Sequence, residues 1–348
     1  MKNFFKNKNI LITGHTGFKG SWLTLILLYL QSNVYGYALK PKRLSLYNVL
    51  NLNNKLRKNK FSDIRDYDQL QKFVIKTEPD IIFHLAAQPI VSEGYLKPLY
   101  TWEVNAEGTL NLLKISEKLK KKCSLVIITT DKVYKDLGKK KYSEHAELEG
   151  ADPYSLSKVA VENITNAWIK IKKNKKIKIS VARAGNVIGG GDWSKNRLIP
   201  DIVRNNFKKK NTYIRRPKFI RPWQYVLKVL EGYLILAKKN YQSKTSKYGG
   251  AYNFGPRVSE CKTVYKVVKE FSKHWDTKVI FKSNKKKFKE TEYLFLNSAK
   301  AKSELNWSSS YSLKETIQKT CNWYKNFYFN KKHIYELSIQ EIKDCLKI

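Results

Sequence analysis

The sequence predicts an α/β protein in which a Rossmann-like, doubly wound parallel sheet is joined to a smaller C-terminal substrate-binding lobe. An apolar stretch, 9–13, runs into a glycine turn and then a helical stretch, 21–30, which is the order that a dinucleotide fold requires. Strand and helix patterns alternate as far as Arg183, as is typical of a parallel sheet covered on both faces. Between Gly185 and Pro222, glycines, prolines and short segments interrupt this alternation, which indicates the smaller lobe.

The domain organisation follows from this change of pattern. We expect a Rossmann domain over 1–184, a mainly substrate-binding lobe over 185–330 from which some segments return to the first domain, and a C-terminal tail over 331–348. A chain of 348 residues can bury a large core and form one compact unit with two lobes. The later elements that we expect are helices over 223–238, 263–273 and 313–328, and strands over 251–254 and 278–281.

The glycine turn is the first candidate cofactor site. Its glycines would permit a tight turn, close approach of the backbone to a pyrophosphate, and close packing of the helix on the strand. The free N–H groups of the helix would face the phosphates. A glycine-rich loop with a purely structural role is the alternative. The candidate contacts are Gly14, His15, Thr16, Gly17, Phe18, Lys19 and Gly20.

The second predicted strand, 34–39, bears on the choice of dinucleotide. It ends at Lys40, with no carboxylate nearby to accept a hydrogen bond from a ribose 2′-hydroxyl. Lys40, Lys42 and Arg43 would instead suit a 2′-phosphate. Charge alone therefore does not decide between NAD and NADP.

Two further strand ends carry candidate cofactor contacts. Asp63 and Ile64 follow a third predicted strand, and Asp63 could meet the adenine edge. The fourth strand, 80–87, would bring Ala86, Ala87 and Gln88 to the nicotinamide ribose. The alternative for Asp63 or Asp66 is a cap for the helix that begins at Tyr67.

A tyrosine and a lysine four residues apart are the first candidate catalytic pair. Tyr154 and Lys158 would lie on one face of a helix, which Asp152 would cap and Pro153 would begin. Holding a tyrosine ionised near neutral pH needs about 4 kcal/mol of anion stabilisation. An adjacent cation and a nicotinamide charge in a dry cleft could supply it. The alternative is an exposed amphipathic helix.

The strong positive charge does not by itself identify a nucleic-acid-binding protein. Lysine and arginine number 68 against 29 aspartate and glutamate, a net charge of +39. No nucleic-acid-binding module accompanies it, so we expect mainly solvated faces and a field that helps recruit an anionic nucleotide sugar. The lysine clusters are spread along the chain, at 120–122, 139–141, 172–178, 208–210 and 285–287.

Cysteine spacing and apolar runs limit the remaining classes. The four cysteines form no Cys-x-x-Cys, so we expect neither a disulfide framework nor a metal site. The longest apolar run, 22–30, is too short to cross a bilayer, and the basic N-terminus lacks the apolar stretch of a signal peptide. We therefore expect no membrane insertion and a cytoplasmic protein.

Several longer motifs resemble those of the extended short-chain dehydrogenase/reductases and, within them, the CDP-glucose 4,6-dehydratases. The similarity covers nearly the whole chain. The glycine turn and the Tyr154/Lys158 pair are typical of the whole superfamily, whereas the stretches at 182–193, 197–201 and 220–224 are much narrower signals. The other matching stretches are 14–23, 84–89, 152–158 and 253–256.

The resemblance implies a hydro-lyase that converts CDP-D-glucose to CDP-4-keto-6-deoxy-D-glucose. Tyr154 would remove the 4-hydroxyl proton while hydride leaves C4, with Thr130 bonded to the same oxygen and Lys158 supporting the phenolate and a cofactor ribose. Asp131 would help the C6 hydroxyl leave. Lys132 would take the C5 proton or steer the electrostatics while another group does. Hydride returns to C6, so a tightly bound, recycled NAD is implied, and NADP is not excluded.

The same resemblance implies the substrate contacts and the assembly. Asn186 and Arg221 would hold the diphosphate, Arg197 and Leu198 would lie along the base or ribose, and Gln88 would border the sugar. Asn105 would order the backbone at the cofactor site. A homodimer or homotetramer through the helices at 98–121 and 153–173, and a place in deoxysugar biosynthesis for lipopolysaccharide O-antigen, are also implied.

Departures from the family pattern leave other readings open. Ser92-Glu93-Gly94, Tyr225, Lys228, Val133 and Asn297 differ from the residues usual in relatives, which puts base and sugar identity in doubt. A dehydratase for another nucleotide hexose is therefore one alternative. A nucleotide-sugar 4-epimerase would share Tyr154 and Lys158 but has no use for Asp131 and Lys132. A non-catalytic nucleotide- or RNA-binding protein is the alternative of a different class.

Overall fold

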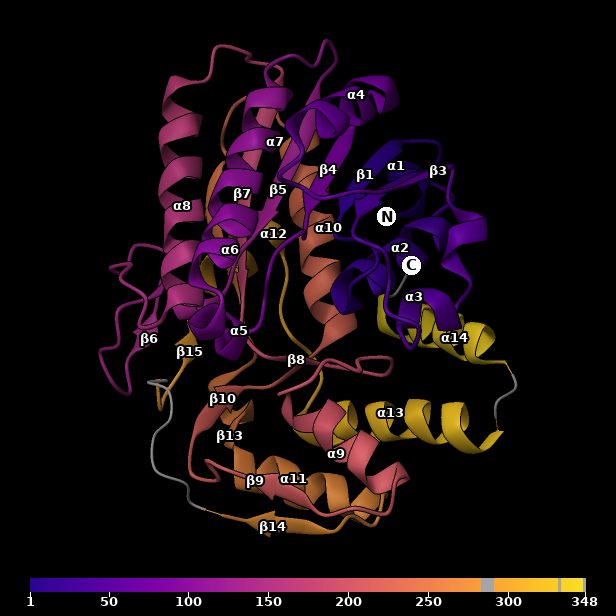
Figure 1. The fold of residues 1–348 in the computed structure, drawn as a ribbon. Helices are drawn as coiled ribbons and strands as arrows, with labels where there is room; N and C mark the ends of the chain where they lie inside the picture. The colour runs from indigo at the N-terminus through magenta and orange to yellow at the C-terminus, as the bar shows by residue number, and fades with distance from the viewer. Residues whose placement is uncertain (283–290, 331–332, 347–348) are drawn as a thin grey trace.

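The computed structural model describes residues 1–282, 291–330 and 333–346 (Figure 1). Its centre is a seven-stranded sheet in the order β12-β7-β5-β4-β1-β2-β3, in which every neighbouring pair is parallel. The order reverses between β1 and β4, which is where parallel sheets open a crevice for ligands. The predicted doubly wound fold is thus confirmed. The strands are β1 (Asn9–Thr13), β2 (Asn33–Ala38), β3 (Lys58–Phe61), β4 (Ile81–His84), β5 (Cys123–Ile128), β7 (Ile177–Ala184) and β12 (Gly250–Phe254).

Two apolar layers cover the sheet because successive strand side chains point to opposite faces. On β1, Ile10 and Ile12 join the layer beneath α2 (Phe18–Tyr29) and α10 (Val226–Gln242). Leu11 joins the other layer, beneath α4 (Tyr67–Thr77), α7 (Gly108–Ser116) and α8 (Pro153–Ile171). Strands buried on both faces explain why the sequence shows nearly continuous apolar runs rather than clean alternation.

The helix starts follow the predicted capping chemistry. Asp152 caps α8 by accepting from the backbone of Tyr154 and Ser155, and Ser155 completes a capping box with Pro153 at the first helical position. Asp66 caps α4 by accepting from Gln69 N. Of the two aspartates weighed for that cap, Asp66 therefore has the role.

The smaller lobe is built from stretches of the chain on both sides of β12 in the sequence. The first stretch leaves the sheet after β7 and ends where α10 returns to it, and later stretches follow β12, which pairs with β7. Within the lobe β10 and β13 pair antiparallel, and β9 and β14 pair parallel. Its elements are α9 (Leu198–Phe207), β9 (Thr212–Ile214), β10 (Ile220–Pro222), β13 (Cys261–Thr263), α11 (Val264–His274), β14 (Val279–Phe281) and α13 (Leu313–Lys325).

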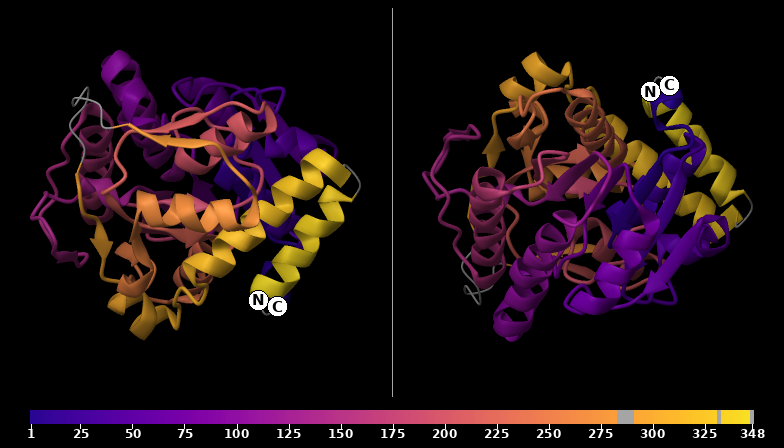
Figure 2. Two further views of the ribbon diagram at one scale, coloured as in Figure 1. Left: turned by 90° about the horizontal axis from the view of Figure 1, so that it is seen from below. Right: turned by 90° about the horizontal axis from the view of Figure 1, so that it is seen from above.

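Several later segments pack on the sheet rather than in the lobe. α10, β12 and α12 (Ala299–Leu305), all within 185–330, lie against the sheet domain. The segment expected to be a tail contains α14 (Ile334–Leu346), which packs on α2 and α10. In both views of Figure 2 the end of α14 lies beside α1 (Lys2–Phe5) at the N-terminus.

Short elements connect these parts. They are α3 (Leu46–Val49), η1 (Leu52–Lys55), α5 (Val91–Leu96), α6 (Pro98–Trp102), the π-helix η2 (Glu103–Glu107), η3 (Asp131–Val133), β6 (Lys141–Tyr142), β8 (Val187–Ile188), β11 (Gln224–Tyr225), η4 (Val258–Glu260), β15 (Phe295–Leu296) and the π-helix η5 (Asn326–Asn330).

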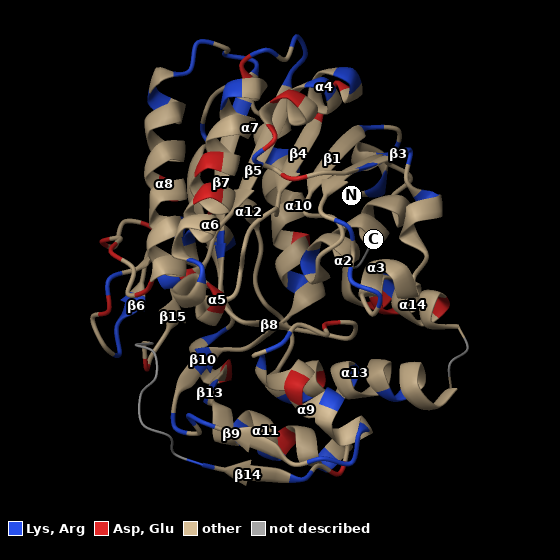
Figure 3. Cartoon of the chain, viewed as in Figure 1, with Lys and Arg blue, Asp and Glu red and all other residues tan. Residues whose placement is uncertain are grey.

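Basic side chains are scattered over both parts of the molecule rather than gathered in one stripe (Figure 3). The cluster at 285–287 lies outside the described residues. Within the described ranges no helix is long and apolar enough to span a membrane, and no group of metal-ligating side chains is found there.

Candidate active site

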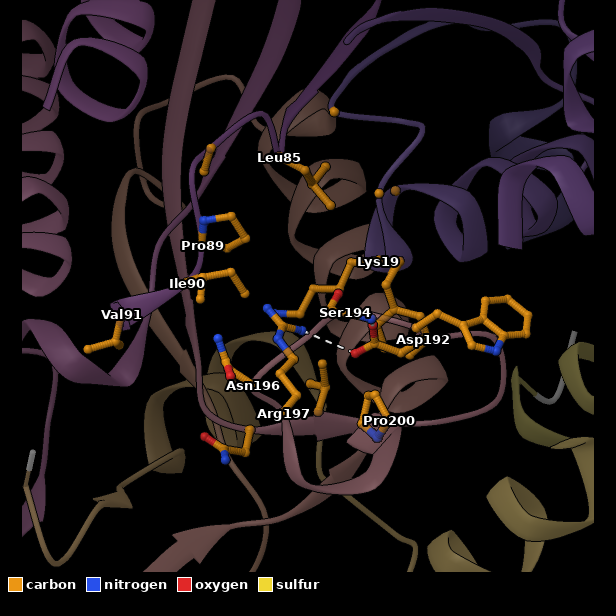
Figure 4. Close-up of a pocket in the computed structure, with 18 of the residues that line it drawn as sticks. Lys19, Leu85, Pro89, Ile90, Val91, Asp192, Ser194, Asn196, Arg197 and Pro200 are labelled. Atoms are coloured by element: carbon orange, nitrogen blue, oxygen red, sulfur yellow. Dashed lines mark hydrogen bonds and ion pairs between the residues drawn. The ribbon is translucent and has the colours of Figure 1, made fainter. Parts of the chain in front are cut away.

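A cleft of about 1180 Å³ lies between the carboxyl ends of the central strands and the smaller lobe. Binding sites for a single small molecule typically occupy ~300–1,000 Å³, so this volume leaves room for a dinucleotide together with a nucleotide sugar. One wall carries Leu85, Pro89 and Ile90, and the Arg197 side chain extends toward it from the lobe (Figure 4).

The glycine turn forms the floor of the cleft at the start of α2. Gly14 has φ +76°, and a Cβ there would lie 2.6 Å from Ala86 N. A Cβ on Gly20 would lie 2.2 Å from Gly14 O. Only glycine fits these two positions, because one needs a left-handed backbone and both lack space. Gly17 is the N-cap of α2 and offers no side-chain cap, so the first N–H groups of the helix are directed at the cleft.

Lys19 is a partly buried lysine in this turn. Its Nζ donates to the hydroxyl of Tyr233 on α10 at 3.4 Å. Burial, followed by the positive charge of Arg197, lowers the pKa of Lys19 to about 7. A group with that pKa changes charge near neutral pH, so the electrostatic field in the floor of the cleft is pH-dependent.

Tyr154 and Lys158 face the end of β5 from the first turns of α8. Lys158 Nζ donates to Ile128 O at 3.3 Å, and Tyr154 is hydrogen-bonded to Thr130. Burial raises the pKa of Tyr154 to about 12, against the opposing effects of Thr130 and Arg197. Burial also lowers the pKa of Lys158 to about 8, against the opposing charge of Glu162.

These pKa values refine the prediction that Lys158 makes Tyr154 a phenolate. In this fold the desolvation of the phenol outweighs the nearby cations, so the protein's own groups keep Tyr154 protonated at neutral pH. A positive ligand charge beside the phenol would favour its ionisation.

Asp131 and Lys132 form an ion pair at the start of η3. Lys132 Nζ lies 3.0 Å from Asp131 Oδ1, which also accepts from Thr130 Oγ at 3.1 Å. Asp131 Oδ2 is buried and has no hydrogen-bond partner among the described residues. A Cβ on Gly185 would lie 2.8 Å from Oδ2, so the glycine leaves space beside this oxygen. A buried carboxylate oxygen without a partner is costly, and a ligand hydroxyl placed there would satisfy it.

Basic and amide groups line the side of the cleft formed by the lobe. Arg197, the N-cap of α9, pairs with Asp192 at 3.3 Å (Figure 4). Asn186 Oδ1 lies 3.5 Å from Lys132 Nζ. Arg221 donates to Ile220 O, and its guanidinium lies 5.1 Å from the ring centre of Phe219. Leu198 lines the cleft beside Arg197.

The loop that carries Arg197 is anchored from behind by aromatic residues of α13 and η5. Tyr324 OH donates to Asp192 O at 2.6 Å and accepts from Asp192 N. Trp193 packs against Trp323 and Phe327. Gly190 lets Trp323 approach, because a Cβ there would lie 2.1 Å from its ring. The side chains of Asp192 and Arg197 thus project from a rigid support.

The adenosine end of the cleft carries the residues that bear on the dinucleotide. Asp63, Ile64, Lys40 and Lys42 all line it. The Asp63 carboxylate is engaged by Arg65, whose Nη2 lies 2.9 Å from Oδ2. The lining thus offers both a carboxylate and two lysines, and its charge favours neither NAD nor NADP.

The profile of the GDP-mannose 4,6 dehydratase family matches residues 11–320. The chain belongs to this family. CDP-glucose 4,6-dehydratase of Salmonella typhimurium is 38% identical over 336 residues, which cover 93% of this chain and 92% of that protein. The resemblance expected from the motifs is therefore confirmed.

Solved structures show that the fold is shared as well. dTDP-glucose 4,6-dehydratase from Bacillus anthracis in complex with NAD superimposes with a TM-score of 0.77 at 22% identity, over 94% of this chain and 99% of that chain. UDP-glucuronic acid 4-epimerase from Bacillus cereus, with UDP-glucuronic acid and NAD, gives a TM-score of 0.79 at 21% identity, over 92% and 99%. Both likenesses establish the fold alone.

In this member of the family, four of the predicted contact residues do not line the cleft. His15 is fully buried against Tyr47 and Gly36, and burial lowers its pKa to about 4. Its side chain points into the core, whereas a ligand contact was expected. Asp131 lies buried behind the cleft surface. The other two are Gln88 and Asn105.

Gln88 and Asn105 instead brace the backbone behind the cleft. The Gln88 amide donates to Thr101 Oγ1 at 2.9 Å and accepts from Ile90 N at 2.6 Å. Asn105 Oδ1 accepts from Gln88 N, and its amide donates to Ser157 Oγ at 2.8 Å. The predicted direct contact of Gln88 with substrate or cofactor is therefore not supported, because its side chain is used internally. The Asn105 amide group bonds both backbone groups of Gln88, and its proposed part in ordering the cofactor site stays a prediction.

Sequence reasoning missed residues that the fold brings to the site from elsewhere. Tyr233 on α10 contacts Lys19, although 214 residues separate them. Arg216 and Phe219 line the cleft below Arg221. Glu162 and Arg183 form a buried ion pair behind Tyr154 and Lys158. Only Glu162 gave a usable signal, since it lies four residues after Lys158 on the same helix.

Proposed function

We propose that this protein is a nucleotide-sugar 4,6-dehydratase that converts CDP-D-glucose to CDP-4-keto-6-deoxy-D-glucose and water. The observation that carries the proposal is the placement of the Asp131–Lys132 ion pair next to the Tyr154–Thr130 pair at one strand end. The first pair suits elimination across C5 and C6, and the second suits oxidation at C4. The 38% identity to a CDP-glucose 4,6-dehydratase supports the same reaction and the same nucleotide.

NAD is the cofactor that we propose. The residues fit it, since Gly14 and Gly20 let the turn pack closely against the neighbouring backbone, and the start of α2 supplies N–H donors for a pyrophosphate. Ile64, Ala86 and Ala87 would border its adenosine and nicotinamide halves, and Lys158 would hold a ribose hydroxyl. When bound, NAD supplies a reversible hydride acceptor whose positive charge favours an ionised Tyr154.

Tyr154 and Thr130 act on the C4 hydroxyl in this proposal. The phenol oxygen takes the hydroxyl proton, and Thr130 holds the same oxygen in place. Lys158 stabilises the anionic form of Tyr154 with its charge. A ketone at C4 makes the C5 hydrogen acidic, which prepares the next step.

Asp131 and Lys132 act on C6 and C5. Before elimination the proton of the Asp131–Lys132 pair lies on Asp131, which gives it to the departing C6 hydroxyl at the unpaired Oδ2 beside Gly185. Lys132, which lines the cleft and is then uncharged, takes the C5 proton, and its ammonium stabilises the enolate that forms. Lys132 returns this proton to C5 when hydride reaches C6. After water leaves, reduction at C6 restores the cofactor, so the net redox change is zero.

The lobe would hold the nucleotide. Arg221 and Asn186 bind the diphosphate, for which a guanidinium fork is well suited. Arg197 and Leu198 lie along the ribose or base. The surplus of lysines raises the local concentration of such an anionic substrate.

Assembly and cellular setting complete the proposal. Leu96, Leu99 and Trp102 of α5 and α6 are exposed together with Leu156 at the start of α8. An apolar surface of this kind suits a homodimer, or a homotetramer built from dimers, and light scattering of the purified protein tests it. We infer a cytoplasmic enzyme that supplies 4-keto-6-deoxysugars for surface polysaccharides such as O-antigen.

The decisive experiment is incubation of the purified protein with a panel of nucleotide glucoses. Turnover of CDP-glucose to a product lighter by one water, with the ultraviolet absorbance of a 4-keto sugar in alkali, supports the proposal. A product of unchanged mass with inverted C4 would identify a 4-epimerase. RNA binding that weakens steeply with salt, with no sugar turnover, would identify a non-catalytic binding protein.

A further inference from the structure

The buried ion pair between Glu162 and Arg183 has no part in the chemistry proposed above. Glu162 is fully buried on α8, and the Arg183 side chain on β7 is 2% exposed. Arg183 Nε lies 2.9 Å from Glu162 Oε1, and Arg183 Nη2 lies 3.0 Å from Oε2. Such a pair brings a large desolvation cost and little net stability. Its position relative to the catalytic turn suggests what it does.

The Glu162–Arg183 pair makes hydrogen bonds on both sides of the turn Thr130–Val133. Before the turn, Thr129 Oγ1 donates to Glu162 Oε1 at 2.5 Å. After the turn, Arg183 Nη1 donates to the hydroxyl of Tyr134 at 2.8 Å. Tyr134 in turn donates to Asn253 Oδ1 on β12 at 2.7 Å. Three neighbouring elements of the fold, α8, β7 and β12, are thereby tied to the turn that carries Thr130, Asp131 and Lys132.

The pair also acts on Lys158. Glu162 lies one helical turn after Lys158, and both side chains reach the end of β5, at Thr129 Oγ1 and Ile128 O respectively. The other titratable groups that face Lys158 are Tyr154 on α8, His84 on β4 and Lys19 on α2. Glu162 is the carboxylate whose charge opposes the burial of the Lys158 ammonium.

We propose that the Glu162–Arg183 pair is a positioning element of this active site, which holds the turn Thr130–Val133 in register with Tyr154 and supplies a negative charge to the Lys158 ammonium. The inference rests on the proposed function for its catalytic readout. Arg183 holds the Glu162 carboxylate in place, and the charge of that carboxylate favours the ammonium form of Lys158, where the phenolate needs a cation.

The test compares pH profiles of kcat for the parent enzyme and for Glu162→Gln. Burial lowers the pKa of Lys158 to about 8 with Glu162 in place. Loss of the carboxylate charge lowers it further, so the alkaline limb of the profile moves down by about one pH unit. This shift alone lowers kcat only about twofold at pH 7, and the lost hold on the turn Thr130–Val133 should bring the total fall to about tenfold while KM changes little.

Matched variants separate positioning from general stability. Glu231→Gln breaks a different buried ion pair, that with Lys228 on α10, away from the cleft. The alkaline limb of this variant should coincide with that of the parent. Tyr134→Phe removes the hydroxyl contact but no charge. The value of kcat should therefore fall while the midpoint of the alkaline limb stays where it is in the parent. If Glu162→Gln does not fold, the test uses two other variants. These are Tyr134→Phe and Thr129→Val, the second of which removes one donor to Glu162.

Two results would overturn the inference. In the first, the alkaline limb of the Glu162→Gln profile coincides with that of the parent, and the loss of activity equals the loss of folded protein. The other, if Glu162→Gln does not fold, is an unchanged kcat in both Thr129→Val and Tyr134→Phe.

A separate measurement keeps the inference distinct from the proposed function. A double-mutant cycle of Lys158→Met and Glu162→Gln in the free energy of unfolding needs no turnover. Coupling between the two sites supports the electrostatic part even if no nucleotide sugar is a substrate. Additive effects would refute that part even in an active enzyme.

Discussion

Asp131 and Lys132 are ion-paired at 3.0 Å, yet only Lys132 lines the cleft, while Asp131 lies fully buried behind it. Asp131 Oδ2, beside Gly185, is buried and has no hydrogen-bond partner among the described residues. If Asp131 acts on a substrate hydroxyl as proposed, Oδ2 is the oxygen left to meet it, once the residues that cover this oxygen move aside.

Asp131→Asn should slow elimination far more than oxidation. The amide keeps the shape of the side chain but cannot deliver a proton readily, and general acid catalysis is typically worth ~10²–10⁴ in rate. In a single turnover, reduced nicotinamide should therefore accumulate, which its absorbance would show. Equal slowing of both steps would contradict the role given to Asp131.

Tyr154→Phe should abolish formation of reduced nicotinamide, with a loss of at least about a thousandfold. The ring remains buried, and only the hydroxyl bonded to Thr130 is lost, so the fold should survive. Tyr252→Phe is the matched control, because its hydroxyl bonds Glu304 outside the cleft. Parent-like turnover in the Tyr154 variant would refute the catalytic role.

The kcat of the enzyme should fall as the pH rises through about 8. Lys158 acts as a cation, and its pKa is lowered to about 8 by burial, so its useful charge is lost above that value. Lys19, whose pKa is lowered to about 7, is largely uncharged at this midpoint, so Lys19→Met should leave the midpoint in place. A downward shift in that variant would mean that another group causes the limb.

Glu341 should make the protein less stable as the pH rises from about 4.5 to 7. Burial raises the pKa of Glu341 from 4.5 to about 7, so the folded state holds a proton that the unfolded state has lost. Its contribution is fully present below pH 4.5 and is lost as the pH rises through about 7, a difference of about 3 kcal/mol at most.

Urea unfolding at several pH values, compared with Glu341→Gln, isolates this contribution of Glu341. The difference in free energy of unfolding between the two proteins should change across that range. A constant difference would show that the contact between Glu341 and the hydroxyl of Tyr225, at 2.6 Å, does not titrate there.

Arg221→Lys should raise KM for the nucleotide sugar about tenfold and change kcat much less. A lysine keeps the charge but loses the planar fork and the stacking on Phe219. Steady-state kinetics measure both constants, and Arg57→Lys, at an exposed position away from the cleft, is the control. A fall in kcat alone would argue against a diphosphate contact.

The order of elements could be predicted from the sequence because each local signal agreed with the global fold. The strand at Asn9–Thr13, the turn at Gly14 and the cap at Asp152 each have a local cause. β12 was predicted as a strand, but its place in the sheet was not, since its pairing with β7 depends on contacts distant in sequence.

The site was predictable as a set of motifs but not as a set of side-chain directions. His15 and Gln88 lie within true motif segments, yet one enters the core beside Gly36 and the other binds its own loop. Which way a side chain leaves a turn depends on the packing behind it. The roles of Tyr233 and Arg183 could not be predicted from the sequence either, because their partners lie on other elements of the fold.

The backbone crosses between the sheet and the smaller lobe several times, and this has a mechanical consequence. The chain enters the lobe after β7, after β12 and after α12, and it returns to the sheet with α10, α12 and α14. A change at one hinge peptide therefore cannot open the cleft, because every crossing would have to bend at the same time. Arg197 and Arg221 lie on the first of these excursions, so any movement of that stretch carries both of them relative to the glycine turn.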